Sequence, residues 1–382
     1  MNFELTEEQK MIQDMARKFA EREIKPVAAE LDRTHNHPKD ITAKMGELGL
    51  MGVTIPDTYG GAGMDYISYV LSMIEISKAC ASCGVIMSVC NSLYNFPVYK
   101  YGTEEQKQKY LRPVASGEAL GCYGLTEAGA GSDPATMRTM AVLEGSEWVI
   151  NGVKKFITNG NVAGYCVLAA VTDKTAGYKG ISSFIVDLNN TPGFRVGTVE
   201  EKLGINASGT AELVFEDARI PKENLLGKQG EGFKQMLSTL DGGRIGIAAQ
   251  ALGIGRAVLE EAVEYSKTRE QFGRPISSFQ AIQWKLADIA TQLDAAELLT
   301  LRAAWLEQNG KGYEKEAAMA KLLASDTAMW AAVEGVQVLG GYGYCKDYPM
   351  ERHMRDAKIT QIYEGTNEIM RLVIARNLLK QR

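Results

Sequence analysis

The alternation of hydrophobic and polar positions changes twice along the chain. Over about the first 120 residues, apolar side chains recur three and four positions apart, which is the spacing of helices. Thr6 and Gln9 have the spacing of a capping box at the start of the first of them. From about residue 121 the chain turns to short β-branched and aromatic runs separated by turn residues, and helical spacing returns from Phe233. The pattern predicts helices, then strands, then helices.

The middle segment contains runs that favour strands at 148–150, 165–171, 181–187, 194–199 and 212–215. Asn151-Gly152 and Asn159-Gly160 are dipeptides typical of tight turns. The segments between the strands are too short for the crossover helices that a parallel sheet needs. We therefore expect a small sheet or barrel that packs on its neighbours.

Two apolar stripes mark the C-terminal helices. The first consists of Phe233, Met236, Leu237 and Leu240, and the second of Ile282, Leu286, Ile289, Leu293 and Ala296. Each is about as wide as the buried side of a bundle helix. Both stripes are predicted to face the core.

Length and charge limit the kind of protein. A chain of 382 residues exceeds what one core usually supports, so two or three packed regions are expected. With 45% hydrophobic and 23% charged residues the composition is that of a globular protein, and the net charge of -5 disfavours nucleic acid or an anionic membrane as the main partner. No apolar run approaches the roughly 20 residues of a membrane span. The first five residues lack the features of a secretory signal, so a cytoplasmic location is expected.

The cysteines give no sign of a metal site. Cys80 and Cys83 have the spacing of half a zinc site, but zinc requires two further ligands. The chain has no second such pair, and His35, His37 and His353 lack ligand spacing. Free buried thiols and no metal are the prediction.

A glycine-rich segment opens the strand region, Tyr123-Gly-Leu-Thr-Glu-Ala-Gly-Ala-Gly-Ser-Asp133. Its small residues allow a ligand close to the backbone, and Thr126 and Ser132 offer hydroxyl groups. A phosphate or a ring with polar edges would fit, although a tight connection between a helix and a strand has the same composition. The segment lacks the Gly-Lys-Ser/Thr of a phosphate-binding loop, and Gly253-Ile-Gly255 lacks the third glycine of a dinucleotide fingerprint.

Two further motifs concern helices. Leu240-Asp-Gly-Gly-Arg244 places two glycines inside a helical pattern, which costs about 1 kcal/mol each relative to alanine and points to close contact with a helix or a ligand. In Tyr363-Glu-Gly-Thr-Asn-Glu368, Gly365 ends one helix and Thr366 can cap the next. Glu364 stands at that junction, where its carboxylate can project into a cleft. Taken alone, such a residue is more often an ion-paired loop acid.

Together with Phe156-Ile-Thr-Asn-Gly160, Arg269-Glu-Gln-Phe-Gly273 and 337–343, these motifs resemble the acyl-CoA dehydrogenase family in order and spacing. The resemblance covers essentially the whole chain and is nearest to short-chain, butyryl-CoA-type bacterial members. It implies a multidomain α+β fold. The expected parts are a helical N-terminal domain at 1–121, a central β-barrel-like domain at 122–228 and a C-terminal four-helix bundle at 229–382.

The resemblance also implies FAD between the middle and C-terminal domains of a homotetramer that is a dimer of dimers. The residues expected near the flavin are Tyr123, Leu125, Thr126, Phe156 and Thr158, with Ser132 at the pyrophosphate. The residues expected to reach FAD from a neighbouring subunit are Arg269, Phe272, Gln337 and Gly341, while Thr366 and Glu368 lie near the FAD of their own subunit.

The implied reaction converts a short-chain acyl-CoA to the trans-2-enoyl-CoA. Glu364 would remove the α proton, the hydride would pass to flavin N5, and an electron-transferring flavoprotein would accept the electrons. The flavin ribityl hydroxyl and the backbone amide of Glu364 would stabilise the enolate oxygen. Expected substrate contacts are Asp241 and Arg244 on the CoA side, Tyr363 and Gly365 beside the base, and Met87 and Leu93, with Ile86 and Val89, at the acyl end.

Differences between this sequence and other members of the family narrow the kind of acyl-CoA dehydrogenase that it resembles. Tyr363-Glu364-Gly365 favours the short- and medium-chain arrangement, because long-chain and isovaleryl-type members place the base on another helix, at a position near Gly243. The segment 83–92 has no arginine to pair with the distal carboxylate of a glutaryl group. A branched or alicyclic acyl-CoA, an acyl-CoA oxidase and a non-enzymatic acyl-CoA-binding scaffold stay open as alternatives.

Overall fold

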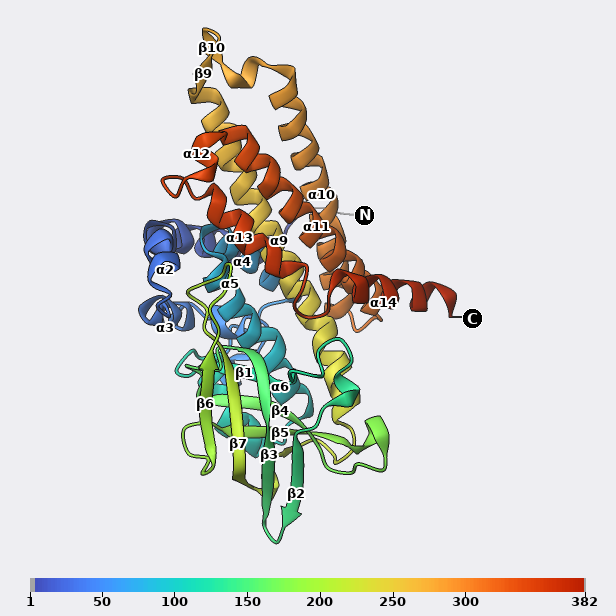
Figure 1. The fold of residues 1–382 in the computed structure, drawn as a ribbon. Helices are drawn as coiled ribbons and strands as arrows, with labels where there is room; N and C mark the ends of the chain where they lie inside the picture. The colour runs from blue at the N-terminus through green and yellow to red at the C-terminus, as the bar shows by residue number, and fades with distance from the viewer. Residues whose placement is uncertain (1–3, 381–382) are drawn as a thin grey trace.

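The computed structural model describes residues 4–380, and its elements follow the predicted order of helices, strands and helices. In Figure 1 the sheet lies at one end of the molecule, and the long C-terminal helices extend from it past the N-terminal helices. Within the described residues no helix is both long and apolar enough to span a membrane.

The N-terminal helices include one, Tyr66–Ala79, that packs against Glu7–Phe19, Ala81–Ser88 and the long C-terminal helix Gly232–Thr268. They are α1 (Glu7–Phe19), α2 (Ala28–Thr34), α3 (Lys39–Glu47), α4 (Tyr66–Ala79), α5 (Ala81–Ser88), α6 (Phe96–Tyr101), α7 (Glu104–Gln106) and α8 (Arg112–Ala115). A π-helical turn, Val89–Asn95, joins α5 to α6. The predicted capping box is confirmed, since Thr6 Oγ1 accepts from the Gln9 amide at 3.2 Å and Gln9 Oε1 accepts from the Thr6 amide at 3.0 Å.

The middle segment forms one mixed sheet. Its strands are β1 (Gly121–Gly124), β2 (Met140–Glu144), β3 (Glu147–Thr158), β4 (Tyr165–Val171), β5 (Ile181–Asp187), β6 (Phe194–Val199), β7 (Thr210–Pro221) and β8 (Leu225–Leu226). The order is β6-β7-β3-β2-β4-β5-β8, with β1 paired in parallel to β4. Every predicted strand lies in or coincides with one of these, and β1, β2 and β8 are additional. A core of aromatic and aliphatic side chains, which includes Trp148, Phe184 and Phe215, fills one face of the sheet and is separate from the main core of the molecule.

The turn predicted at Asn151-Gly152 is wrong. Both residues lie inside β3, where Asn151 pairs with Met140 and the register with β7 shifts before Gly152. A Cβ atom on Gly152 would stand 2.5 Å from Thr139 Oγ1. Glycine is needed here because another chain segment passes close by, and no reversal of the chain occurs.

The C-terminal segment is built on three long helices. Its elements are α9 (Gly232–Thr268), α10 (Gln280–Gln308), α11 (Glu314–Leu339), α12 (Gly341–Tyr344), α13 (Met350–Thr360) and α14 (Asn367–Leu379), with a short hairpin of β9 (Glu270–Gln271) and β10 (Arg274–Pro275). Helix α11 packs against α9, α10 and α13, which completes the bundle, whereas α14 projects from its side (Figure 1). The second predicted stripe faces the core, and Ile289, Leu293 and Ala296 are fully buried.

Candidate active site

A cavity of about 560 Å³ lies where the sheet, the N-terminal helices and the C-terminal helices meet. Its size is in the usual range for a site that encloses a small molecule. The residues from the first half of the chain that line it are Val85, Val89, Leu93, Tyr123, Leu125, Thr126, Gly131, Ser132, Asp133, Pro134, Phe156, Ile157 and Thr158. Those from the second half are Phe233, Leu237, Leu240, Asp241, Arg244, Glu314, Tyr363, Glu364, Gly365, Ile369, Leu372, Val373 and Arg376.

Glu364 reaches the cavity from the loop between α13 and α14. Its backbone is left-handed, with φ of 52°, and Gly365 follows with φ of 95°. Thr366 caps α14 as predicted, because its side chain accepts from the amide of Ile369 at 3.3 Å. Within residues 4–380 the backbone N–H of Glu364 makes no hydrogen bond, so it is free to donate to a ligand.

The carboxyl group of Glu364 is enclosed and under-bonded. Its Oε2 atom is buried and has no hydrogen-bond partner among the described residues. Burial raises the pKa of Glu364 to about 8, and the positive charges of Lys321 and Arg244 oppose part of that rise. A carboxyl group with a pKa near neutrality is suited to act as a general base.

Gly243, inside α9, makes room for this carboxyl group. A Cβ atom there would stand 1.9 Å from Glu364 Oε2 and 3.0 Å from Leu93 Cδ2. At the neighbouring Gly242 it would meet the Tyr66 hydroxyl at 2.9 Å. The close contacts expected for the two helical glycines are therefore present, one with the candidate base and one with α4.

Asp241 and Arg244 form an ion pair beside Glu364. Arg244 is buried and donates from Nη1 to Asp241 Oδ1 at 2.6 Å. Burial raises the pKa of Asp241 to about 6 although Arg244 opposes the shift. On the other side, the Tyr363 hydroxyl donates to Gln250 Oε1 of α9, which holds the loop against that helix.

The prediction that the first apolar stripe faces the core is confirmed only in part. Met236 is fully buried, and Phe233 and Leu240 pack against the core, but Phe233, Leu237 and Leu240 also line the cavity. Periodicity identifies an apolar side of a helix, but a ligand can cover that side as well as another helix can.

The middle segment offers a surface suited to a flat ring with polar edges. Phe156 lies at a bulge in β3 with φ of 61°, and its side chain is 56% exposed. The amide of Lys155 donates to the carbonyl of Thr126 at 2.8 Å, which ties the glycine-rich segment to this bulge. The hydroxyls of Thr126, Ser132 and Thr158 line the region without a hydrogen bond to any residue of the part described.

A buried ion pair holds the glycine-rich segment from behind. Lys154 is fully buried and donates to Glu127 Oε1 at 2.8 Å and to the Leu125 carbonyl at 3.1 Å. Glu127 also accepts from the Arg138 amide at 2.7 Å and from the Thr139 amide and hydroxyl at 2.9 and 2.6 Å. Because every partner is satisfied, the pair fixes the position of the loop that lines the cavity.

The remaining predicted residues lie outside the cavity. Arg269 and Gly341 line a separate groove beside Tyr265 and Tyr342, and Phe272 projects from the tip of the β9–β10 hairpin, 92% exposed. Gln337 is exposed on α11, Thr366 is the cap of α14, and Glu368 is exposed in its first turn. Met87 is fully buried and is not among the residues that line the cavity.

Cys80 and Cys83 are buried free thiols, as predicted. Among residues 4–380 no group of histidine, cysteine, aspartate and glutamate side chains is arranged to hold a metal ion.

The sequence reasoning missed several residues of the site. Arg376, Leu372 and Ile369 belong to α14, and no local pattern distinguishes them from surface residues of that helix. Lys321 is buried under the Glu364 loop. A signal for it did exist, since this lysine stands among small apolar residues at helical spacing, including Ala317 and Ala324.

Family models match the chain in three consecutive parts. They are the acyl-CoA dehydrogenase N-terminal domain at residues 6–118, the middle domain at 122–218 and the C-terminal domain at 230–379. The chain is 52% identical over 380 residues to the short-chain specific acyl-CoA dehydrogenase of Clostridium acetobutylicum, with all of both chains covered. The chain belongs to the acyl-CoA dehydrogenase family.

Solved structures agree over the same length. Butyryl-CoA dehydrogenase from Megasphaera elsdenii is 46% identical with a TM-score of 0.98, and all of both chains is covered. A chain from the structure of the electron transferring flavoprotein of Acidaminococcus fermentans is 54% identical with a TM-score of 0.99, again with full coverage. Enzymes of this family depend on FAD, and the polar and aromatic lining described above fits that cofactor.

Proposed function

We propose that this protein oxidises a short-chain acyl-CoA of the butyryl-CoA type to the trans-2-enoyl-CoA, with Glu364 as the base. The observation that carries the proposal is the enclosed Oε2 of Glu364, which faces the cavity without a partner and has its pKa raised toward neutrality. The identity to short-chain and butyryl-CoA dehydrogenases over the whole chain supports the substrate class.

Two groups of Glu364, its carboxyl group and its backbone N–H, have separate roles in removing the α proton. An α proton next to a thioester is weakly acidic, so its removal needs a base and a donor for the enolate oxygen. Glu364 takes the proton at Oε2, and its own backbone N–H is free to donate to the thioester oxygen. When bound, FAD supplies the acceptor for the hydride that leaves the β carbon.

The walls of the cavity exclude water from the reacting carbons. Val85, Val89 and Leu93 are buried apolar residues on the side of α5 and the turn that follows it. Leu93 also lies close to Gly243, beside the carboxyl group of Glu364. We assign the acyl end of the substrate to this side, and the CoA side to Asp241 and Arg244.

FAD is assigned to the sheet side of the cavity. We infer that Tyr123, Leu125, Thr126, Phe156 and Thr158 contact the flavin, and that Ser132 contacts the pyrophosphate. The free hydroxyls of Thr126, Ser132 and Thr158 support this assignment, because they can bond the polar edges of the cofactor.

A homotetramer is proposed from the groove that holds Arg269 and Gly341 and from the exposed Phe272 and Tyr344, which are 92% and 84% exposed. Large exposed aromatic side chains are typical of surfaces that another subunit covers. In that assembly Arg269, Phe272, Gln337 and Gly341 would reach the FAD of a neighbour, and Thr366 and Glu368 would lie near the FAD of their own subunit. An electron-transferring flavoprotein is the proposed electron acceptor, which the match to the Acidaminococcus fermentans structure supports. A cytoplasmic location stays a prediction.

The test is an anaerobic titration of the purified protein, followed by its absorbance spectrum. We expect a yellow protein whose flavin band bleaches most with butyryl-CoA, compared with longer, branched and alicyclic acyl-CoAs. Stronger bleaching by a branched or alicyclic thioester would mean that this thioester is the substrate class. Rapid reoxidation of the reduced flavin once oxygen is admitted would indicate an acyl-CoA oxidase. A colourless protein that FAD does not reconstitute would leave the acyl-CoA-binding scaffold.

A further inference from the structure

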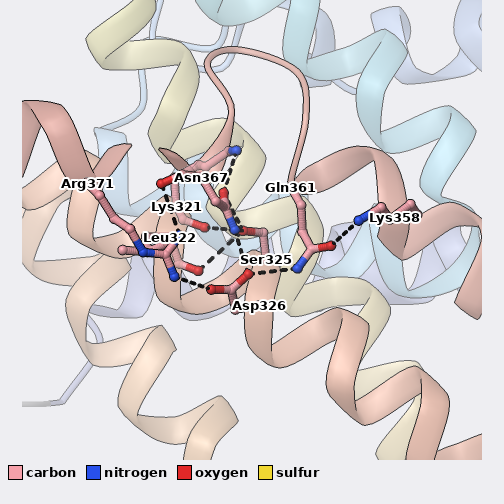
Figure 2. Close-up of polar contacts among 8 residues, drawn as sticks. All are labelled: Lys321, Leu322, Ser325, Asp326, Lys358, Gln361, Asn367 and Arg371. Carbon is pink, nitrogen blue, oxygen red and sulfur yellow. Dashed lines mark hydrogen bonds and ion pairs between the residues drawn. The ribbon is translucent and has the colours of Figure 1, made fainter. Parts of the chain in front are cut away.

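A fully buried lysine lies beneath the loop that carries Glu364. Lys321 belongs to α11, and its ammonium group donates to the carbonyl of Gly365 at 2.7 Å and to Asn367 Oδ1 at 2.8 Å. Gly365 directly follows Glu364, and Asn367 begins α14. Figure 2 shows Lys321 reaching from α11 toward Asn367.

A hydrogen-bond network extends from Asn367 to α11. Asn367 Nδ2 donates to Ser325 Oγ at 2.9 Å and to Asp326 Oδ1 at 2.7 Å, and both acceptors belong to α11. Asp326 also accepts from Gln361 Nε2 at 2.7 Å (Figure 2). The loop is therefore held to one helix on both sides of Glu364.

These bonds support a backbone conformation that is unfavourable by itself. Glu364 has φ of 52°, which an L-residue with a long side chain seldom adopts unless its surroundings enforce it. Lys321 donates its hydrogen bond to the carbonyl of Gly365, which directly follows the strained backbone of Glu364. A shift of this unit would move the carboxyl group out of the cavity.

Lys321 also contributes charge to the site. The charged groups that face it are Glu364, Asp326, Glu368 and Arg244; burial lowers the pKa of Lys321, and the carboxylate of Glu364 opposes that shift. Around Glu364 the ionisable groups are Lys321, Arg244, Tyr363 and, from α4, Tyr66 and Tyr69. Because the charge of Glu364 favours the ammonium form of Lys321, ionisation of the carboxyl group and protonation of the lysine support each other.

We propose that Lys321 is a positioning residue for proton abstraction: its bonds to Gly365 and Asn367 fix the Glu364 carboxyl group in the cavity, and its charge stabilises the carboxylate. The inference rests on the proposed function, since it takes Glu364 to be the base. It assigns Lys321 no contact with substrate or cofactor.

The experiment compares three holoenzymes, the wild type, Lys321→Met and Lys358→Met. Lys358 is the matched control, because it is an exposed lysine whose Nζ donates to Gln361 Oε1 at 2.9 Å, at the far side of the same network (Figure 2). The rate of flavin reduction by butyryl-CoA is measured in a stopped-flow instrument under anaerobic conditions, as a function of thioester concentration and pH.

We expect Lys321→Met to retain FAD and to bind the thioester with nearly unchanged Kd, while the limiting rate falls about 10- to 100-fold. The alkaline rise of the rate should also move to higher pH, because loss of a positive charge raises the pKa of Glu364. Lys358→Met should behave as the wild type. If Lys321→Met does not yield a folded flavoprotein, Lys321→Gln, which keeps an amide donor but no charge, is measured in the same way with the same expected shift.

A variant at position 321 with the wild-type rate and pH profile would overturn the inference while leaving the proposed function intact. So would a reduced rate with an unchanged pH profile, which would assign Lys321 a structural role alone. If no acyl-CoA reduces the wild type, the proposed function fails, and the inference fails with it.

Discussion

The carboxyl group of Glu364 occupies the space in which a side chain of residue 243 would stand. A Cβ atom on Gly243 would lie 1.9 Å from Glu364 Oε2, although the two residues belong to different elements, helix α9 and the loop before α14. A glutamate at either position could therefore deliver a carboxylate to the same region of the cavity. Only one carboxylate at a time fits this space, so a side chain at position 243 and the Glu364 carboxyl group exclude each other.

Gly243→Ala should impair catalysis more than folding. The added methyl group would push the Glu364 carboxyl group aside, and a displacement of about 1 Å can lower a rate about 100-fold. Stopped-flow reduction by butyryl-CoA measures the effect. Gly242→Ala is the matched control, since its methyl group meets the Tyr66 hydroxyl at 2.9 Å and the Tyr313 hydroxyl at 3.9 Å, and not the Glu364 carboxyl group. Equal rates in both variants would contradict the contact.

Glu364→Gln should lower the rate of flavin reduction by about 100- to 10,000-fold, the usual contribution of a general base. FAD binding should persist. In the wild type Glu364 must be ionised to act as the base. The rate of flavin reduction should therefore rise with pH through about 8, the value to which burial raises the pKa of Glu364 in the protein without substrate. A pH profile followed by flavin absorbance checks both expectations, and a variant that keeps the wild-type rate would exclude Glu364 as the base.

The same substitution should stabilise the fold at alkaline pH. Because the folded-state pKa of Glu364 is raised to about 8, the folded protein resists ionisation of this group. That penalty is absent below the ordinary pKa of about 4.3 and grows as pH rises to about 8. The Tm of Glu364→Gln should exceed that of the wild type by about 2 °C or more at pH 8, and by less at pH 5.

Glu368→Gln is the control for this measurement. Glu368 is exposed in the first turn of α14, and hydrogen bonds to its own backbone amide and Thr366 lower its pKa, so its replacement should not stabilise the fold. A lower Tm for Glu364→Gln than for the wild type at every pH would contradict the burial of the carboxyl group.

Lys154→Met should loosen the glycine-rich segment and weaken retention of FAD. The substitution leaves the Glu127 carboxylate buried without its cation, which costs about 3 to 5 kcal/mol of folding stability. Lys155→Met is the matched control, because Lys155 pairs with Glu200 and Glu212 nearer the surface. Thermal unfolding and gel filtration with flavin absorbance measure the two effects. Similar losses in both variants would show that the buried pair has no special role.

Leu93→Ala and Met87→Ala should separate the two residues that the sequence placed at the acyl end. Leu93 lines the cavity, so its truncation should raise the preference for hexanoyl-CoA over butyryl-CoA by about 10-fold. Met87 is fully buried outside the cavity, so its truncation should cost about 2 to 5 kcal/mol of stability and leave the preference unchanged. The measurement is the ratio of kcat/KM for hexanoyl-CoA to that for butyryl-CoA in each variant. A change of this ratio in Met87→Ala but not in Leu93→Ala would place the acyl end of the substrate at Met87.

The sequence by itself determined the local features of the chain. The Thr6–Gln9 capping box and the cap at Thr366 depend on residues within four positions of one another, so pattern was sufficient. The helix end predicted at Gly365 was placed too late, because α13 already ends at Thr360. Runs of β-branched and aromatic residues likewise located strands such as β4 and β5. The motif at 363–368 indicated where a carboxylate could stand, and resemblance to the family indicated its role.

Only the tertiary structure decided what surrounds that carboxylate. The contact of Gly243 with Glu364, the bond from Lys321 to Gly365 and the bulge at Gly152 each join segments that local pattern cannot bring together. The stripe of Phe233, Leu237 and Leu240 also shows that an apolar helix face does not reveal whether protein or ligand will cover it. The physical reason is that burial, and with it the pKa of Glu364, depends on every segment that removes water from the site, whereas periodicity records only the side of its own helix or strand.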